Sequence, residues 1–187
     1  MNYPNGLKKE QKITSKHIAF KNRGMNLENE LNDTNQYYID NEKAYIYKKP
    51  TPIKLVKVDY KIGRINEAYF AMPSTTDYNG IYNGKYIDFE AKETINKKGF
   101  PLGNIHKHQI LHIRNIYKAH GICFLIIRFT SFNKTYLLLA KDFLDFIDEN
   151  KKTIIPLSYI EEKGFLIKEK FVPRVDYLEI IDELEDV

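Results

Sequence analysis

The chain has 187 residues, which is enough for one well-packed domain and does not call for a second. Its 43% hydrophobic and 29% charged residues are typical of a globular protein, and it has neither an apolar run of membrane-span length nor a signal peptide. A single cysteine, Cys123, excludes a disulfide framework and a thiolate zinc site within the chain. These features favour a cytoplasmic protein without membrane contact.

Charge is unevenly distributed, although the formal net charge is only +4. Residues 1–23 carry six basic side chains and one acidic one, whereas residues 176–187 carry six acidic side chains and no basic one. A basic segment with little apolar periodicity predicts a mobile arm that orders on a polyanion such as DNA, and solvated surface is the alternative. The candidate DNA contacts of this arm are Lys8, Lys9, Lys12 and Arg23.

The first apolar pattern follows the dipeptide Arg23-Gly24. It predicts a helix, because Leu27, Leu31, Thr34 and Tyr38 recur at helical spacing and would form one face. Glu28 lies at the flank of this face, and Glu30 is its nearby competitor as a functional acid. An exposed helix charge explains Glu28 equally well.

Three strands are expected next, at residues 44–47, 53–60 and 64–70. The two prolines of the sequence KKPTP exclude a regular central strand between the first and the second. The second and third strands are joined by the basic tip Lys61-Ile62-Gly63-Arg64, so they form a projecting hairpin over about residues 55–70. Lys61 and Arg64 are candidate DNA contacts.

The stretch around Lys85–Lys92 carries the clearest chemical signal. Apolar and charged residues alternate along it, which predicts a strand buried on one face and places Asp88, Glu90 and Lys92 together on the other. The dipeptide Asn83-Gly84 predicts a tight hairpin turn that folds residues 77–81 back along this strand. Asp77 is therefore expected near Glu90.

Two carboxylates and a lysine across a hairpin suit metal-assisted hydrolysis of a phosphodiester. Asp77 and Glu90 offer hard oxygen ligands to Mg²⁺, and Lys92 could orient the attacking water or deprotonate it, the latter after burial lowers its pKa. Asp88 shares the face of Glu90 and could either support the site or lie in solvent. Thr75 and Thr76 precede Asp77 and could bind phosphate through their hydroxyls or simply pack.

A second helix is expected after the breaker-rich loop of residues 99–103, with Asn104 as its cap. Its apolar stripe contains Ile110, Ile113 and either Ile116 or Tyr117. Gln109 lies near its start, and an exposed helix amide is one interpretation of it. His106 and His108 make a poor zinc site without further ligands, so we interpret them as DNA-facing or structural.

The remaining pattern completes an α/β fold. Residues 122–129 form a continuous apolar strand suited to the middle of a sheet, and a strand at 135–140 and a helix follow. We expect a hairpin around Gly164 and a short acidic helix from Tyr177. Together these elements predict a central mixed sheet flanked by helices.

Several long stretches resemble one known family, the RecU Holliday-junction resolvases of the PD-(D/E)XK nuclease superfamily. They cover almost the whole chain and read NRGMNLENELN, KKPTPIKLVKVDY, PSTTDYNG, GKYIDFEAKET and FPLGNIHKHQ. The resemblance implies a restriction-endonuclease-like fold, with residues 1–23 as an arm and residues 24–187 as one nuclease domain. It also implies that the projecting hairpin is a stalk entering the centre of the junction. The family's proline after Val58-Asp59-Tyr60 is missing here and the connection is shorter, which puts the stalk length in doubt.

The resemblance also implies the cofactor and the roles of individual residues. Asp77 and Glu90 would hold Mg²⁺, which Mn²⁺ could replace, with the Ala91 carbonyl as a further ligand. Glu28 and Gln109 are catalytic candidates, and the candidate metal-site residues also include Gln109 and Thr75. Thr76 is a candidate nucleic-acid contact.

The implied activity is symmetric nicking of four-way DNA junctions by a homodimer during recombination and repair, leaving ligatable nicks with 5′-phosphates. The recombinase and the branch-migration machinery are implied partners. Two alternatives stay open at the level of sequence. One is an endonuclease of the same fold that acts on linear duplex DNA, and the other is a non-catalytic DNA-binding modulator of recombination.

Overall fold

The computed structural model describes residues 26–71 and 75–184. The predicted arm, with Lys8, Lys9, Lys12 and Arg23, lies outside these residues. The helices are α1 (Leu27–Asp40), the 3₁₀ turn η1 (Leu102–Asn104), α2 (Lys107–Lys118), α3 (Ala140–Glu149), α4 (Leu157–Lys163) and α5 (Tyr177–Glu183). Within the described part of the chain, no helix combines the length and apolar character needed to cross a membrane.

The strands form one large sheet and two small ones. They are β1 (Tyr45–Lys48), β2 (Ile53–Asp59), β3 (Arg64–Phe70), β4 (Tyr78–Tyr82), β5 (Lys85–Thr94), β6 (Gly99–Pro101), β7 (Ile122–Phe129), β8 (Lys134–Leu139), β9 (Ile154–Pro156) and β10 (Phe165–Ile167). The large sheet has six strands in the order β1-β4-β5-β7-β8-β10. Only β5 and β7 pair in parallel, so the predicted mixed sheet is confirmed.

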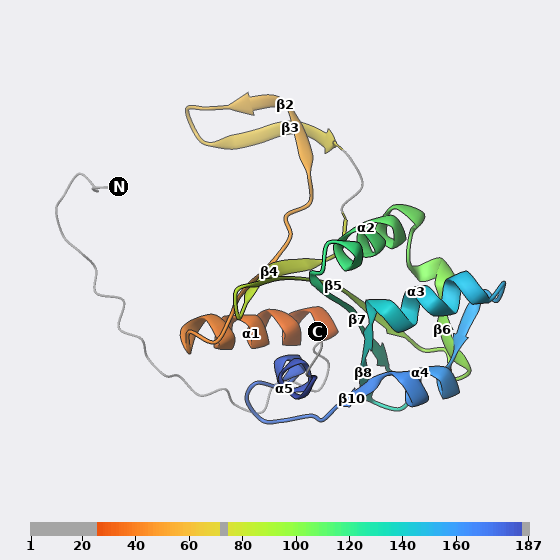
Figure 1. The fold of residues 1–187 in the computed structure, drawn as a ribbon. Coiled ribbons are helices and arrows are strands. Elements are labelled where there is room, and N and C mark those ends of the chain that lie inside the picture. Colours follow the sequence, from red (N-terminus) through yellow and green to blue (C-terminus); the bar gives the residue numbers. More distant parts are fainter. Residues whose placement is uncertain (1–25, 72–74, 185–187) are drawn as a thin grey trace.

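Helices cover both faces of this sheet, α1 and α5 on one side and α2, α3 and α4 on the other (Figure 1). Strand β7 shows the consequence, since Phe124 and Ile126 enter one core while Leu125 and Ile127 enter the other. All eight of its residues are buried. A strand covered on both faces is expected to be largely apolar, which explains the run from Ile122 to Ile127. The buried Arg128 near its end is paired with Glu30.

The tight turn between β4 and β5 forms as predicted. Asn83 and Gly84 both adopt positive φ angles, of 47° and 75°, and β4 pairs antiparallel with β5 from Tyr82 and Lys85 to Tyr78 and Phe89. Positive φ at both central residues is the geometry of a type I′ turn, which favours Asn-Gly. The turn therefore brings the start of β4, and Asp77 just before it, alongside the middle of β5.

Strands β2 and β3 form a separate two-stranded sheet that stands away from the main body (Figure 1). All seven residues of β3 are exposed, and so are the first five of β2. Lys61 lies in the turn between the strands and Arg64 begins β3, and both are exposed, as the basic tip suggested. The hairpin has no core of its own, so its position depends on the segments that join it to β1 and β4.

Three local predictions are wrong. Residues 99–103 are not a plain loop, because β6 pairs with β9 and η1 follows. Helix α2 is capped by His106 rather than Asn104, which belongs to η1. The expected hairpin around Gly164 is instead the end of helix α4, which leads into β10.

Candidate active site

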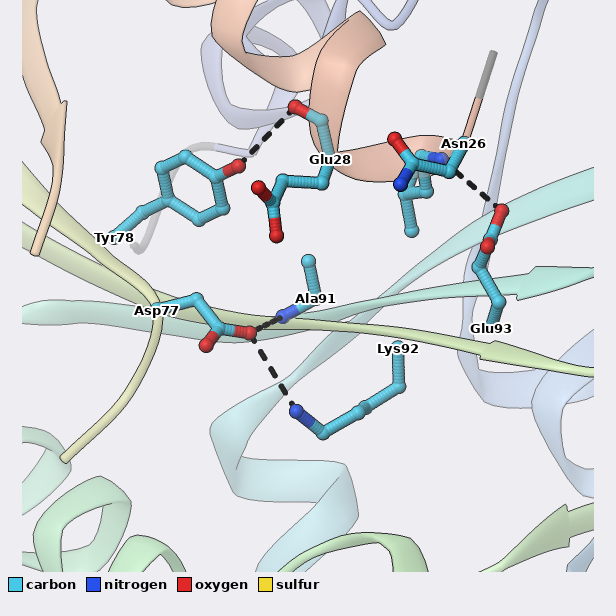
Figure 2. A pocket seen from close by; sticks show the side chains of 8 residues that line it. Asn26, Glu28, Asp77, Tyr78, Ala91, Lys92 and Glu93 are labelled. Carbon is cyan, nitrogen blue, oxygen red and sulfur yellow. Dashed lines mark hydrogen bonds and ion pairs between the residues drawn. The ribbon is translucent and has the colours of Figure 1, made fainter. Parts of the chain in front are cut away.

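A pocket of about 180 Å³ opens between the start of α1 and the edge of the sheet at β4 and β5 (Figure 2). It exists because the pairing of β4 with β5 ends at Tyr78 and Phe89, whereas β5 continues to Thr94. The residues lining it are Asn26, Leu27, Glu28, Asp77, Tyr78, Ala91, Lys92 and Glu93. Asp77 and Lys92 thus share one pocket, whereas Glu90 does not line it.

Asp77 occupies the place that the next residue of β4 would take. Its Oδ2 accepts a hydrogen bond of 3.2 Å from the Ala91 backbone N–H and lies 3.6 Å from Lys92 Nζ. Its backbone carbonyl accepts a hydrogen bond of 2.8 Å from the Lys49 N–H. Figure 2 shows the carboxylate pointing toward Ala91 and Lys92, with the carboxylate of Glu28 approaching from the helix above.

Glu90 is fully buried on the opposite face of β5 from the α1 core. Its Oε1 forms an ion pair with Lys92 Nζ and accepts a hydrogen bond of 2.7 Å from Gln109 Nε2. Its Oε2 is buried without a hydrogen-bond partner among the described residues. Burial, reinforced by the negative charge of Asp77, raises the pKa of Glu90 from 4.5 to about 7. An unpartnered buried carboxylate oxygen of this kind calls for a cation.

Lys92 lies between the two carboxylates with a partly exposed side chain. Burial lowers the pKa of Lys92, but the charges of Glu90 and Asp77 outweigh burial, so the pKa is raised above its ordinary value. The expectation of a lowered pKa for Lys92 is therefore wrong, because it considered burial and not the two neighbouring carboxylates. In this arrangement Lys92 is an ammonium that can donate hydrogen bonds toward the pocket.

Gln109 faces the site rather than solvent. Besides its bond to Glu90, its Nε2 donates to the Thr75 carbonyl at 3.1 Å, and its Oε1 accepts from the His106 N–H at 2.9 Å. One buried amide thus connects the start of α2, the segment before Asp77 and the acid of β5. His106 and His108 are both exposed, and their rings stack with centroids 5.4 Å apart.

The two glutamates of α1 separate clearly in the structure. Glu28 lines the pocket and pairs with Lys48 Nζ at 2.5 Å. Glu30 points away into a buried ion pair with Arg128 Nη2, also at 2.5 Å, and contacts Arg174 at 3.3 Å. Of the two competitors, only Glu28 lines the pocket.

Asp88 is fully buried, so the alternative that places it in solvent is wrong. Its oxygens accept from the Thr76 hydroxyl and from Lys49 Nζ, the latter at 2.6 Å. Thr76 is itself fully buried, so its hydroxyl does not face solvent in this arrangement. Sequence analysis did not single out Lys49, which lies 39 residues from Asp88 and carries no local signal of the contact.

The donor set fits a hard divalent cation. Among the residues that the structure describes, no three His, Cys, Asp or Glu side chains group closely enough to form a metal site by themselves. Mg²⁺ is commonly bound by one or two carboxylates, with water and substrate phosphate completing its shell. Asp77 and Glu90, with its unpartnered Oε2, match that pattern.

Comparison with known proteins supports one family. The family model of "Recombination protein U" (RecU) matches residues 22–183. A protein of Oceanobacillus iheyensis named Holliday junction resolvase RecU is 49% identical over 197 residues, covering 98% of this chain and 99% of the relative. The proteins of the same name from Limosilactobacillus fermentum and Streptococcus agalactiae serotype Ia are 49% and 47% identical. These two alignments cover 97% and 98% of this chain, and 89% and 96% of the relatives.

The match spans α1, the projecting hairpin, the β4–β5 hairpin with Asp77 and Glu90, and α2 with Gln109. It therefore includes every described element that lines the pocket, and this chain belongs to the RecU family.

Proposed function

We propose that this chain is a Holliday junction resolvase, a metal-dependent endonuclease that places symmetric nicks in four-way DNA junctions. The names of its relatives support the substrate. The observation that carries the chemistry is the fully buried Glu90 carboxylate, whose Oε1 pairs with Lys92 and whose Oε2 has no hydrogen-bond partner among the described residues, while Asp77 and Lys92 line the adjoining pocket. A structural ion pair would not require such a free oxygen.

Asp77 and Glu90 are the residues that would hold Mg²⁺, with Mn²⁺ as a substitute. Bound there, the ion would activate water and offset negative charge on the phosphate. Gln109 fixes the Glu90 carboxylate through its amide and so leaves Oε2 free. Glu28 reaches the same pocket from α1 and would contribute through water, since its side chain is half-exposed. Thr75 is held beside the site through its carbonyl.

Lys92 is the residue that faces the reacting phosphate. Its ammonium group lies beside both acids, and its side chain is 28% exposed, so it can reach a ligand in the pocket. Held there, it orients the attacking water and stabilises negative charge on the phosphate as the bond breaks.

Each pocket can cut one strand, so two symmetric nicks need two copies of the site, which a two-fold homodimer supplies. The exposed hairpin of β2 and β3, with Lys61 and Arg64 at its tip, would act as the stalk that enters the junction. The arm at residues 1–23, with Lys8, Lys9, Lys12 and Arg23, would add phosphate contacts. The recombinase and the branch-migration machinery are further partners of this proposal.

The test compares cleavage of a labelled four-way junction with cleavage of a matched linear duplex in Mg²⁺ and in EDTA. Wild-type protein should cut the junction in Mg²⁺ only, and Asp77→Asn should lose at least a hundredfold in rate while still binding the junction. Asp145→Asn, an exposed acid on α3, is the matched control and should cut normally.

Each alternative has its own outcome. Equal cutting of the duplex would retain the site but replace the junction as substrate. Binding without any cutting by the wild-type protein would favour a non-catalytic modulator of recombination. Undiminished cutting by Asp77→Asn would remove this pocket from the chemistry.

A further inference from the structure

A second group of charged and polar side chains adjoins the site, and apart from Thr75 its members have no part in the mechanism above. We call it the hairpin-root cluster, and it comprises Lys49, Thr75, Thr76, Asp88 and His112. Lys49 Nζ is at its centre, 3.1 Å from Thr75 Oγ1, 2.6 Å from Thr76 Oγ1 and 2.6 Å from Asp88 Oδ2. His112 Nε2 lies 3.1 Å from the same Asp88 oxygen.

Both oxygens of Asp88 are fully engaged. Oδ1 accepts from the Thr76 hydroxyl, and Oδ2 contacts Lys49, His112 and the Tyr86 hydroxyl, the last at 2.9 Å. The Asp88 side chain is fully buried and that of Lys49 is 12% exposed. A buried ion pair is tolerated only when its hydrogen bonds are satisfied, as these are. Unlike Glu90, Asp88 therefore has no free oxygen to offer a ligand.

The cluster holds together both ends of the projecting hairpin. Lys49 directly follows β1 and leads out toward β2, whereas Thr75 and Thr76 lead back from β3 into β4. The backbone of Lys49 adds a further bond to this returning segment, from its N–H to the Asp77 carbonyl at 2.8 Å. Lys49 thus contacts each of the three residues from Thr75 to Asp77.

The cluster also reaches the catalytic strand. Asp88 lies two positions before Glu90 on the same face of β5, and Thr76 is bonded directly to Asp88. The chain from Asp88 through Thr76 to Asp77 therefore fixes one candidate metal ligand against the strand that carries the other. Mg²⁺ demands near-ideal geometry, and a misplacement of about 1 Å can lower a rate on the order of a hundredfold.

We propose that Lys49 and Asp88 are positioning residues that set the separation of Asp77 from Glu90 and thereby the affinity of the site for a divalent cation. The inference rests on the proposed function, because it assigns these two acids to the metal. It adds that the metal site needs more than its two acids. Asp77 must already be held in place, with its hydrogen bond from the Ala91 N–H formed, before any metal binds.

Two measurements on the DNA-free protein test it. The first is exchange of the Ala91 backbone amide in EDTA, followed by NMR. In Asp88→Asn this amide should exchange at least tenfold faster, whereas the Ile126 amide in the central strand β7 should be unchanged. The second is Mn²⁺ binding by calorimetry, where the Kd should rise at least tenfold in Asp88→Asn.

Removing one charge leaves the other buried, so the double variant Lys49→Met/Asp88→Asn supplies a folded comparison without an unpaired charge. It should show the same losses at Ala91 and in Mn²⁺ affinity with a normal urea midpoint. Lys57→Gln, an exposed residue on β2, is the matched control and should change neither quantity.

The outcomes separate the inference from the function on which it rests. Unchanged exchange at Ala91 in Asp88→Asn and in the double variant would overturn the positioning role, whatever the metal result. A third outcome is faster exchange at Ala91 in Asp88→Asn with Mn²⁺ binding that does not change, even in Asp77→Asn. This outcome would support the role of the cluster in positioning Asp77. It would refute the proposed metal site and, with it, the claim that the cluster sets metal affinity.

Discussion

Replacing Glu90 by glutamine should change the stability of the metal-free protein in a way that depends on pH. Burial raises the pKa of Glu90 from 4.5 to about 7, so ionisation of this carboxyl destabilises the folded state. The destabilisation is absent well below pH 4.5, grows between pH 4.5 and 7 and is complete above pH 7, because the folded protein holds the proton that the unfolded chain has released.

The magnitude follows from the two pKa values. One pH unit corresponds to about 1.4 kcal/mol, so the ionised carboxylate costs the wild-type fold roughly 2–3 kcal/mol more near pH 8 than near pH 5. Glutamine cannot ionise and has no such dependence. Any constant effect of the amide on packing cancels when the variant is compared with wild type at both pH values.

The assay is urea unfolding in EDTA, followed by far-ultraviolet circular dichroism at both pH values. The stability of Glu90→Gln relative to wild type should rise by roughly 2–3 kcal/mol from pH 5 to pH 8, equivalent to roughly 5–10 °C in Tm. Glu67→Gln, at an exposed position of β3, should show no such change. An identical effect of Glu90→Gln at both pH values would refute the argument from burial. When Mg²⁺ replaces EDTA, it should stabilise wild type and Glu67→Gln but not Glu90→Gln.

Three further predictions concern the fold and the DNA contacts. Arg128→Met should lower the free energy of unfolding by roughly 3–5 kcal/mol, because it leaves Glu30 buried without its main partner; a loss below about 1 kcal/mol in urea would contradict this. Gly80→Ala should disrupt the pairing of β1 with β4, because a Cβ at this position would lie 2.0 Å from a backbone oxygen of β1. A Cβ at Gly103 would meet nothing within 4 Å, so the control Gly103→Ala should unfold like wild type. Deleting residues 1–23 should flatten the salt dependence of junction binding without abolishing cleavage, and an unchanged slope would exclude the arm from binding.

Local sequence signals predicted much of the fold. The dipeptide Asn83-Gly84 specified its turn because few other residues tolerate two successive positive φ angles. The helix followed from the helical spacing of Leu27, Leu31, Thr34 and Tyr38, and the buried strand at 122–129 followed from its continuous apolar run. Neither signal needs knowledge of distant contacts. From this hairpin turn alone, Asp77 could be predicted to lie near the strand that carries Glu90 and Lys92.

The misses share a physical cause, which is dependence on partners far away in sequence. The pairing of β6 with β9 organised a stretch whose breakers suggested a loop, and α4 replaced the expected hairpin at Gly164. The alternation along β5 predicted one buried face, yet Asp88 and Glu90 on the other face are buried as well, with Gln109 of α2 bonded to Glu90. Lys49 was overlooked because its contact with Asp88 joins residues that only the folded sheet brings together.

The most direct test of the central claim is to map the nicks that the protein makes in a four-way junction in Mg²⁺ at nucleotide resolution. Wild-type protein should produce two symmetrically placed nicks that a DNA ligase reseals. Glu90→Gln should bind the same junction and leave it intact. Nicks that persist at the same positions in Glu90→Gln would contradict the assignment of this carboxylate to the chemistry.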